Sequence, residues 1–224
     1  MNIVCIIGSP NGREGNTARL TDLVLQGAKS QGALCEFVCL TPELVGPCLS
    51  CDSCHTSGDC SRRDGFEELR EKIEAADGVI LASPNYIFSV SAQMKAFMDR
   101  CSGVIHCMSF RGKYGLSVVT SGAGEDGPVI DYMNQFLLVT GVTPVGGVHA
   151  AMGTLPGGEF PEDLQQKARD LGAHLVKAWK SQEMDEDVLL AMTSFREKMR
   201  SLILCQKDHW PYEYAYWQRH HDLQ

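Results

Sequence analysis

Four cysteines lie close together in one short stretch of the sequence, residues 48–60. Thiolates this close in sequence can surround one metal centre, which is either an iron–sulfur cluster or a tetrahedral zinc ion, or they can form a redox-active dithiol. A structural zinc site usually takes its ligands as two separated pairs, whereas here three cysteines follow one another at three-residue intervals, which favours cluster ligation. The four candidate metal ligands are Cys48, Cys51, Cys54 and Cys60.

The other six of the ten cysteines are scattered, mostly in apolar stretches where a thiol packs as a small hydrophobe. The first residues, 1–7, contain neither a basic segment nor a small-residue cleavage site, so we expect no signal peptide and a cytoplasmic protein. In that reducing compartment, clustered cysteines indicate metal or redox chemistry rather than structural disulfides.

A second candidate site follows the first apolar run of the chain. The segment Gly8–Thr17 is small and polar and leads into a helix, whose N-terminal amides attract an anion. Asn16 stands where the Walker pattern has lysine, and Pro10 replaces the second glycine of the dinucleotide fingerprint. The segment therefore predicts a monophosphate site in which Ser9, Asn16 and Thr17 are donors and Arg13 adds one positive charge.

Regular elements must position these two segments. Apolar runs at 3–7, 33–40, 78–82, 114–120 and 142–150 predict strands, and the segments between them and after the last have helical spacing. Strands that alternate with helices predict an α/β fold with a parallel sheet covered on both faces. Right-handed crossovers bring the loops that follow the strands to one edge, where open α/β sheets bind ligands.

Three of these loops, taken together, resemble the flavodoxin-like NAD(P)H-dependent FMN reductase superfamily. They are Gly8–Thr17, Ser83–Ser89 and Thr120–Gly122, and the similarity extends through about residue 180. It implies a flavodoxin-like three-layer sandwich with a five-stranded parallel sheet in the order 2-1-3-4-5, and a bound FMN. A flavin needs a flat apolar wall and a few amides that tune its potential. The predicted cofactor-binding residues are Ser9, Asn11, Arg13, Asn16 and Thr17, then Pro84, Asn85, Tyr86, Ile87 and Phe88 against the ring, and Ser121 and Gly122 on its other side.

The cysteine segment, residues 41–64, then indicates the subfamily. It resembles the insertion of the iron–sulfur flavoproteins, in which a cluster exchanges electrons with FMN. The resemblance implies an FMN-dependent oxidoreductase with a [4Fe-4S] cluster, in which the flavin rather than a protein side chain carries the chemistry. NAD(P)H or a ferredoxin-type protein is the expected donor. Two alternatives stay open: an NAD(P)H-dependent quinone or FMN reductase without a cluster, and a non-catalytic redox-sensing module that binds a protein.

Composition limits the partners. The chain of 224 residues has 20 Lys and Arg against 28 Asp and Glu, a net charge of −8, which argues against a basic face for nucleic acid. Its apolar runs fall short of the roughly 20 residues of a membrane helix. We expect a small-molecule or protein electron donor or acceptor, and, from the family resemblance, a homodimer or homotetramer.

We divide the chain into a flavodoxin-like FMN-binding domain, residues 1–182, and a C-terminal helix with an aromatic tail, residues 183–224. Five of the 17 aromatic residues are in this tail, which is too much apolar surface to leave in water. We expect an arm that packs on a neighbouring subunit, and the alternative is a segment folded onto its own domain. The remaining polar candidates are expected to face solvent, and they are His55, His106, Glu125 and Asp126.

Overall fold

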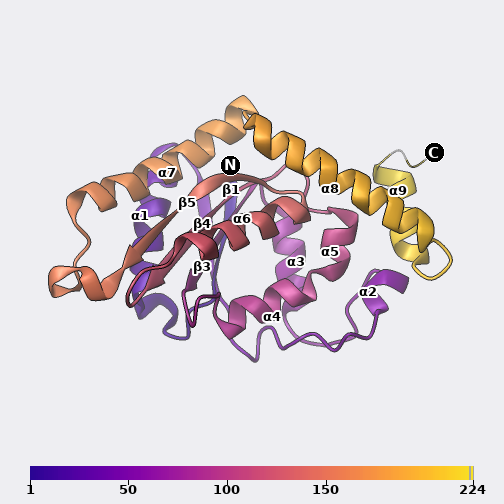
Figure 1. Cartoon of the computed structure of the whole chain (residues 1–224), viewed down its shortest axis with the longest axis horizontal. Coiled ribbons are helices and arrows are strands. Elements are labelled where there is room, and N and C mark those ends of the chain that lie inside the picture. Colours follow the sequence, from indigo (N-terminus) through magenta and orange to yellow (C-terminus); the bar gives the residue numbers. More distant parts are fainter. Residues whose placement is uncertain (222, 224) are drawn as a thin grey trace.

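The computed structural model describes residues 1–221 and 223. Its centre is a sheet of five parallel strands in the order β2-β1-β3-β4-β5 (Figure 1). The predicted α/β class and strand order are confirmed. The strands are β1 (Asn2–Ile7), β2 (Leu34–Cys39), β3 (Gly78–Pro84), β4 (Tyr114–Ser121) and β5 (Thr143–Ala151).

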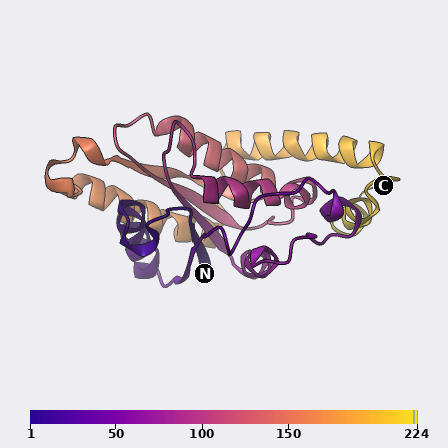
Figure 2. The ribbon, with the colours of Figure 1, turned by 90° about the horizontal axis from the view of Figure 1, so that it is seen from below.

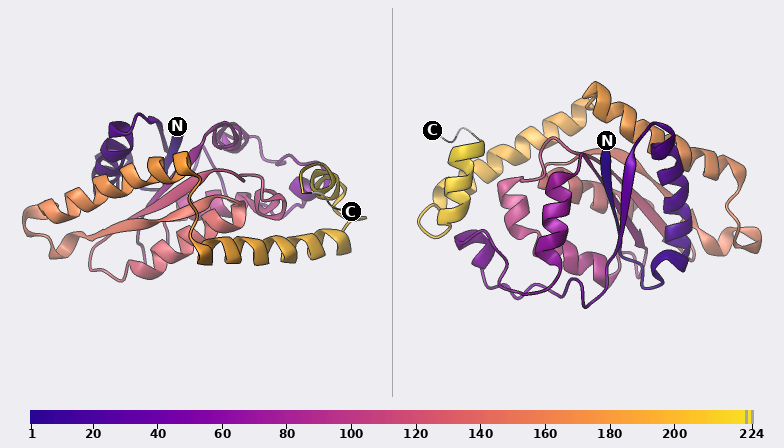
Figure 3. Two further views of the ribbon diagram at one scale, coloured as in Figure 1. Left: turned by 90° about the horizontal axis from the view of Figure 1, so that it is seen from above. Right: turned by 180° about the vertical axis from the view of Figure 1, so that it is seen from behind.

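Helices cover both faces of the sheet, as Figures 2 and 3 show. Along β1, Ile3 and Ile7 pack in the core under one pair of helices, while Val4 and Ile6 pack under the helices of the opposite face. Both faces are therefore buried, which explains why the strand is apolar without alternation. The first face carries α1 (Asn16–Ser30) and α7 (Glu162–Ser181), and the second carries α3 (Phe66–Ala75), α4 (Ala92–Arg100) and α6 (Gly127–Thr140).

Helices α1 and α7 approach each other closely because each has a glycine where they cross. A Cβ atom at Gly27 would lie 1.8 Å from the carbonyl oxygen of Arg169, and one at Gly172 would lie 1.9 Å from that of Val24. Any larger residue at either position would push the two helices apart. This contact holds α1, and with it the Gly8–Thr17 segment, in place.

Two groups of elements mark the ends of the molecule (Figure 1). At one end are the short turns η2 and η3, and at the other the cysteine segment meets the C-terminal helices. No helix in the described part of the chain combines the length and apolar character needed to cross a membrane. The elements whose bounds have not yet been given are η1 (Gly12–Glu14), α2 (Ser53–Thr56), α5 (Ser102–Cys107), η2 (Met152–Thr154), η3 (Pro156–Gly158), α8 (Glu186–Cys205) and α9 (Pro211–His220).

The aromatic tail folds onto its own chain, so the expectation of an arm on a neighbouring subunit is wrong. Trp217 of α9 is fully buried, and its Nε1 donates to the carbonyl oxygen of His106 at 2.9 Å. His221 Nε2 lies 2.8 Å from the carbonyl oxygen of Cys107. The physical reason is that α5 and α2 leave a surface at this end of the molecule, which α9 covers with its aromatic side chains.

Candidate functional site

The loops after β1, β3 and β4 surround a cavity of about 290 Å³ at the carboxyl edge of the sheet. Open parallel sheets bind their ligands at this edge. Thr120 and Met152 also line the cavity, although the sequence-based prediction did not include them. The predicted cofactor-binding residues that line it are Ser9, Asn11, Asn16, Thr17, Pro84, Asn85, Tyr86, Ser121 and Gly122.

The first turn of α1 offers an anion site in this cavity. Its N-cap residue is Gly15, in an extended conformation, and no described side chain caps it. The unpaired backbone N–H groups and the helix dipole therefore favour a negative group there. A Cβ at Gly15 would lie 3.1 Å from the Oγ atom of the buried Ser9, so glycine permits this close turn. The Thr17 and Thr120 hydroxyl oxygens are 2.6 Å apart and join the turn to the loop after β4.

A buried carboxylate joins the loops after β3 and β4. The Asn85 side-chain amide donates to Asp126 Oδ1 at 3.0 Å, and the Ser121 hydroxyl donates to Asp126 Oδ2 at 3.0 Å. His149 Nδ1 lies 3.4 Å from the same Oδ2 atom. The expectation that Asp126 is solvated is wrong, because these donors allow its carboxylate to be fully buried. Asn85 Oδ1 is also buried and has no hydrogen-bond partner among the described residues. Asn85 lines the cavity, so one residue of the cavity wall has an acceptor that is not paired.

Three predicted residues do not line the cavity. Ile87 and Phe88 are 91% and 76% exposed and form the tip of the turn Tyr86–Ser89, each with a positive φ. The Arg13 guanidinium lies over the ring of Phe37, 3.9 Å from its centroid, in a cation–π contact. A role for these three residues in cofactor binding stays a prediction.

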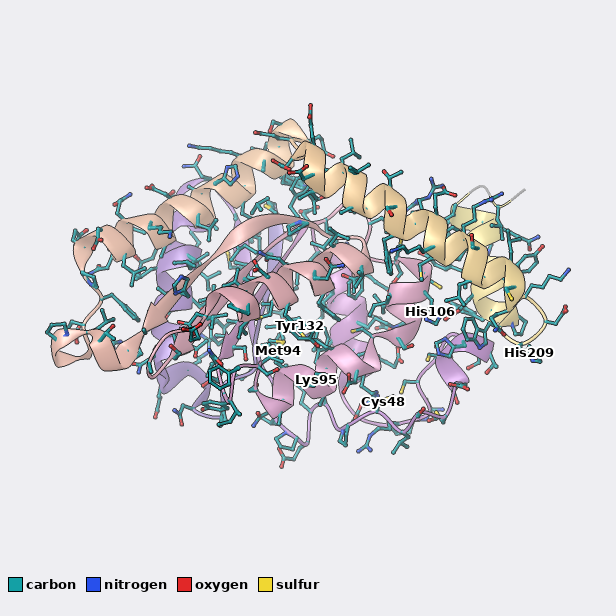
Figure 4. The ribbon with its side chains drawn as sticks, viewed as in Figure 1. Cys48, Met94, Lys95, His106, Tyr132 and His209 are labelled. Atoms are coloured by element: carbon teal, nitrogen blue, oxygen red, sulfur yellow. The ribbon has the colours of Figure 1, made fainter. Side chains whose placement is uncertain are left out.

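All four clustered cysteines line a second cavity, of about 370 Å³. Figure 4 shows Cys48 to the right of α4, between this helix and α2. Within the segment, the Ser61 hydroxyl is 2.9 Å from Cys51 Sγ, and the Ser50 backbone N–H donates to Cys48 Sγ at 3.4 Å. Hydrogen bonds with Ser53 and Ser61 lower the pKa of Cys51 to about 7. All ten cysteines are free thiols, so the four sulfurs are available as ligands.

A buried arginine at the end of α4 fixes both ends of the cysteine segment. Arg100 Nη1 donates to the Gly46 carbonyl oxygen at 3.1 Å, and Nη1 and Nη2 donate to the two carboxylate oxygens of Asp64 at 2.8 and 3.1 Å. Its Nε donates to Cys60 Sγ at 3.1 Å. Burial alone raises the pKa of Asp64, but the bonds from Arg100 and from backbone amides outweigh it and hold the pKa well below its usual range. The pair is therefore charged.

The second fixed point of the cysteine segment is the Glu213 clasp, which consists of His55, His106 and Glu213. The buried Glu213 carboxylate places Oε1 2.5 Å from His55 Nδ1 and Oε2 3.0 Å from His106 Nδ1. Hydrogen bonds with Cys54 and Glu213 raise the pKa of His55 to about 10. The expectation that both histidines face solvent is wrong, because α9 covers them; Figure 4 shows His106 beside this helix.

The ring geometry shows that the clasp is a carboxylate bridge. The two imidazole rings stack with centroids 4.7 Å apart and planes at 22°. Lone pairs in nearly parallel planes do not converge on one point, so the two Nδ1 atoms are poorly placed to share a metal ion. Each instead faces its own oxygen of Glu213. The clasp thereby docks α9 against α2 and α5.

The strand order, the anion site at the start of α1 and the cavity at the carboxyl edge define a flavodoxin-like, flavin-dependent oxidoreductase. Residues 1–156 match the family described as NADPH-dependent FMN reductase. An iron-sulfur flavoprotein of Archaeoglobus fulgidus is 37% identical over 195 residues, which cover 85% of this chain and 87% of that protein. The chain belongs to the NADPH-dependent FMN reductase family, and within it to the iron–sulfur flavoproteins.

Solved structures agree with the fold. An FMN-dependent NADH-azoreductase from Bacillus anthracis in complex with FMN is 14% identical, with a TM-score of 0.60 over 79% of this chain and 100% of that chain. A flavodoxin, WrbA-like protein from Agrobacterium tumefaciens is 19% identical, with a TM-score of 0.54 over 81% of this chain and 99% of that chain. At these identities the likeness concerns the fold alone.

Proposed function

We propose that the chain moves electrons between a reduced donor, FMN and a [4Fe-4S] cluster bound by Cys48, Cys51, Cys54 and Cys60. The observation that carries this proposal is that all four thiols line one cavity. Four sulfur ligands suit an iron–sulfur cluster, whose function in a protein is electron transfer. The donors that reach Cys48, Cys51 and Cys60 support a cluster further, because hydrogen bonds to ligand sulfurs tune its potential.

The cavity at the carboxyl edge is the proposed FMN site. The N-terminus of α1, with Ser9, Asn16 and Thr17, fits the phosphate, because it combines unpaired amides with hydroxyl and amide donors. The segment Pro84–Tyr86 offers the wall for the ring, with Ser121 and Gly122 opposite. FMN bound there supplies hydride and single-electron chemistry. The chain's own residues bind and orient it, and Asp126 holds Asn85 and Ser121 in place.

The two cavities share no lining residue, and the cysteine segment meets α9 at one end of the molecule (Figure 1). We therefore propose a homodimer or homotetramer in which the cysteine segment of one subunit approaches the flavin of the next. Ile87 and Phe88 offer exposed apolar surface beside the FMN cavity for such a contact. The proposed donor is NAD(P)H or a ferredoxin-type protein in the cytoplasm, and residues 1–182 form the FMN-binding domain, which residues 183–224 extend.

The test is the cofactor content after anaerobic reconstitution with iron, sulfide and FMN. We expect about four iron atoms and four sulfides per chain, together with one flavin. Cys51→Ser should lose the iron and sulfide and keep the flavin. Cys205→Ser is the matched control, because Cys205 is exposed and does not line the cysteine cavity.

Three outcomes would contradict the proposal. If the protein contains one zinc ion per chain and no sulfide, the four cysteines form a zinc site and not a cluster. A wild-type protein that binds flavin but neither metal, and that oxidises NAD(P)H at the same rate after Cys51→Ser, would be a quinone or FMN reductase without a cluster. A folded protein that binds no FMN, and whose oligomer size changes with redox conditions, would be a non-catalytic redox-sensing module.

A further inference from the structure

We propose that Arg100 sets the reduction potential of the cluster through its hydrogen bond to the Cys60 sulfur. Arg100 is thus a positioning residue, since it acts through a ligand. The inference rests on the proposed cluster and deepens it. The side chain is fully buried at the C-terminal end of α4, an element of the sandwich rather than of the cysteine segment.

The guanidinium group has no freedom to turn away from the sulfur. Both carboxylate oxygens of Asp64 and the carbonyl oxygen of Gly46 accept from its Nη atoms, and the guanidinium carbon lies 4.6 Å from the centroid of the Phe66 ring. Because the guanidinium is a rigid planar fork, these contacts also fix the direction of the Nε–H bond. That bond points to Cys60 Sγ at 3.1 Å.

A donor held in this way stabilises negative charge on the sulfur. Reduction adds one electron to a cluster and increases the negative charge on its sulfurs, so the hydrogen bond stabilises the reduced state more than the oxidised state. The bond therefore raises the potential. Asp64 acts in the opposite direction, because its carboxylate is ionised and balances the guanidinium charge.

Two substitutions separate this effect from the structural role of Arg100. In Arg100→Gln, the side-chain nitrogen occupies the position of the arginine Nε and can still donate to Cys60. The methionine of Arg100→Met is as long as glutamine but has no hydrogen-bond donor. Both variants have the same net charge and both lose the fork to Asp64. We expect the reduction potential of the cluster to be lower in Arg100→Met than in Arg100→Gln. A redox titration monitored by electron paramagnetic resonance measures both potentials. A tenfold shift of the reduction equilibrium corresponds to about 59 mV for one electron.

Asp64→Asn gives an independent test with the opposite sign. It leaves the guanidinium charge uncompensated beside Cys60, so the potential should rise above that of the wild type. If Arg100→Met does not retain a cluster, the potential of Asp64→Asn alone tests whether the Arg100 guanidinium raises the potential of the cluster. Arg169→Gln is the control, because it also removes one positive charge but lies on α7, on the opposite face of the sheet, where its nitrogens bind Glu162 and Gln165. The potential of this variant should stay at the wild-type value.

The outcomes separate this inference from the proposed function. If the wild-type protein acquires no iron and sulfide, the proposed function fails and this inference fails with it. If the wild type holds a cluster and the potentials of Arg100→Met and Arg100→Gln agree within error, this inference alone is overturned. An Asp64→Asn potential that is equal to or below that of the wild type overturns it as well.

Discussion

Glu213→Gln removes one negative charge from the point where α9 docks onto the cysteine end of the molecule. The Glu213 side chain is fully buried, and its two oxygens contact His55 and His106. Loss of one partner of a buried ion pair costs about 3–5 kcal/mol. We take the lower value, about 3 kcal/mol, because His55 can lose its proton in the variant. Since every 1.4 kcal/mol is a factor of ten, this corresponds to roughly a 100-fold easier opening of α9.

Amide hydrogen exchange followed by mass spectrometry measures this opening directly. The protection factors of peptides in Pro211–His220 should fall by roughly 100-fold in Glu213→Gln, while those of β1 and β3 should stay unchanged. Glu197→Gln, at an exposed position of α8, is the matched control and should behave as the wild type. If the protection factors of α9 fall by less than about threefold in Glu213→Gln, the view that the clasp holds this helix is refuted. It is also refuted if Glu197→Gln lowers them to the same extent.

Two further predictions concern the FMN cavity and the tail. Thr17→Val removes a hydroxyl that we place at the FMN phosphate, so the dissociation constant for FMN, measured by flavin fluorescence, should rise about tenfold. Thr193→Val, at an exposed position, is the control. An unchanged dissociation constant in Thr17→Val would count against the proposed FMN site. Burial and neighbouring positive charges lower the pKa of His221 from 6.5 to about 4, although its bond to the Cys107 carbonyl opposes them. The unfolded chain therefore takes up this proton first, so the unfolding free energy should be highest above pH 6.5 and should fall, by at most about 3 kcal/mol, as the pH drops towards 4. Urea unfolding of His221→Gln across this range should show a smaller fall, and identical profiles for the two proteins would contradict the prediction.

The sheet, the loops that meet at its carboxyl edge and the grouping of the four cysteines could be predicted from the sequence. The continuous apolar run of β1 indicates a strand that is buried on both faces of the sheet, and Ile3 and Val4 do pack in the cores on its two faces. The loops at the carboxyl edge follow from strand order and crossover hand alone. Cys48 and Cys60 are near each other in the sequence, so a compact loop is enough to bring both to the same cavity.

The partners of the cysteine segment could not be predicted, because they come from distant parts of the chain. Arg100 is 40 residues from Cys60, and Glu213 is 158 residues from His55. Nothing around either residue in the sequence indicates a buried charge, and a polar residue is ordinarily exposed. Asp126 was missed as well. It is buried because the Asn85 amide donates to it from the loop after β3 and the Ser121 hydroxyl from the end of β4, while His149 of β5 lies 3.4 Å from its Oδ2 atom.

Electron exchange between the two cofactors tests the proposed function most directly. In the anaerobically reconstituted wild-type protein, the cluster is reduced in flavin-free form, excess reductant is removed, and FMN is added. We predict that the electron paramagnetic resonance signal of the reduced cluster decays while the flavin absorption bleaches, with matching electron counts. In Cys51→Ser the flavin should stay oxidised. A wild-type protein in which the cluster signal persists beside oxidised, bound FMN would contradict the proposal.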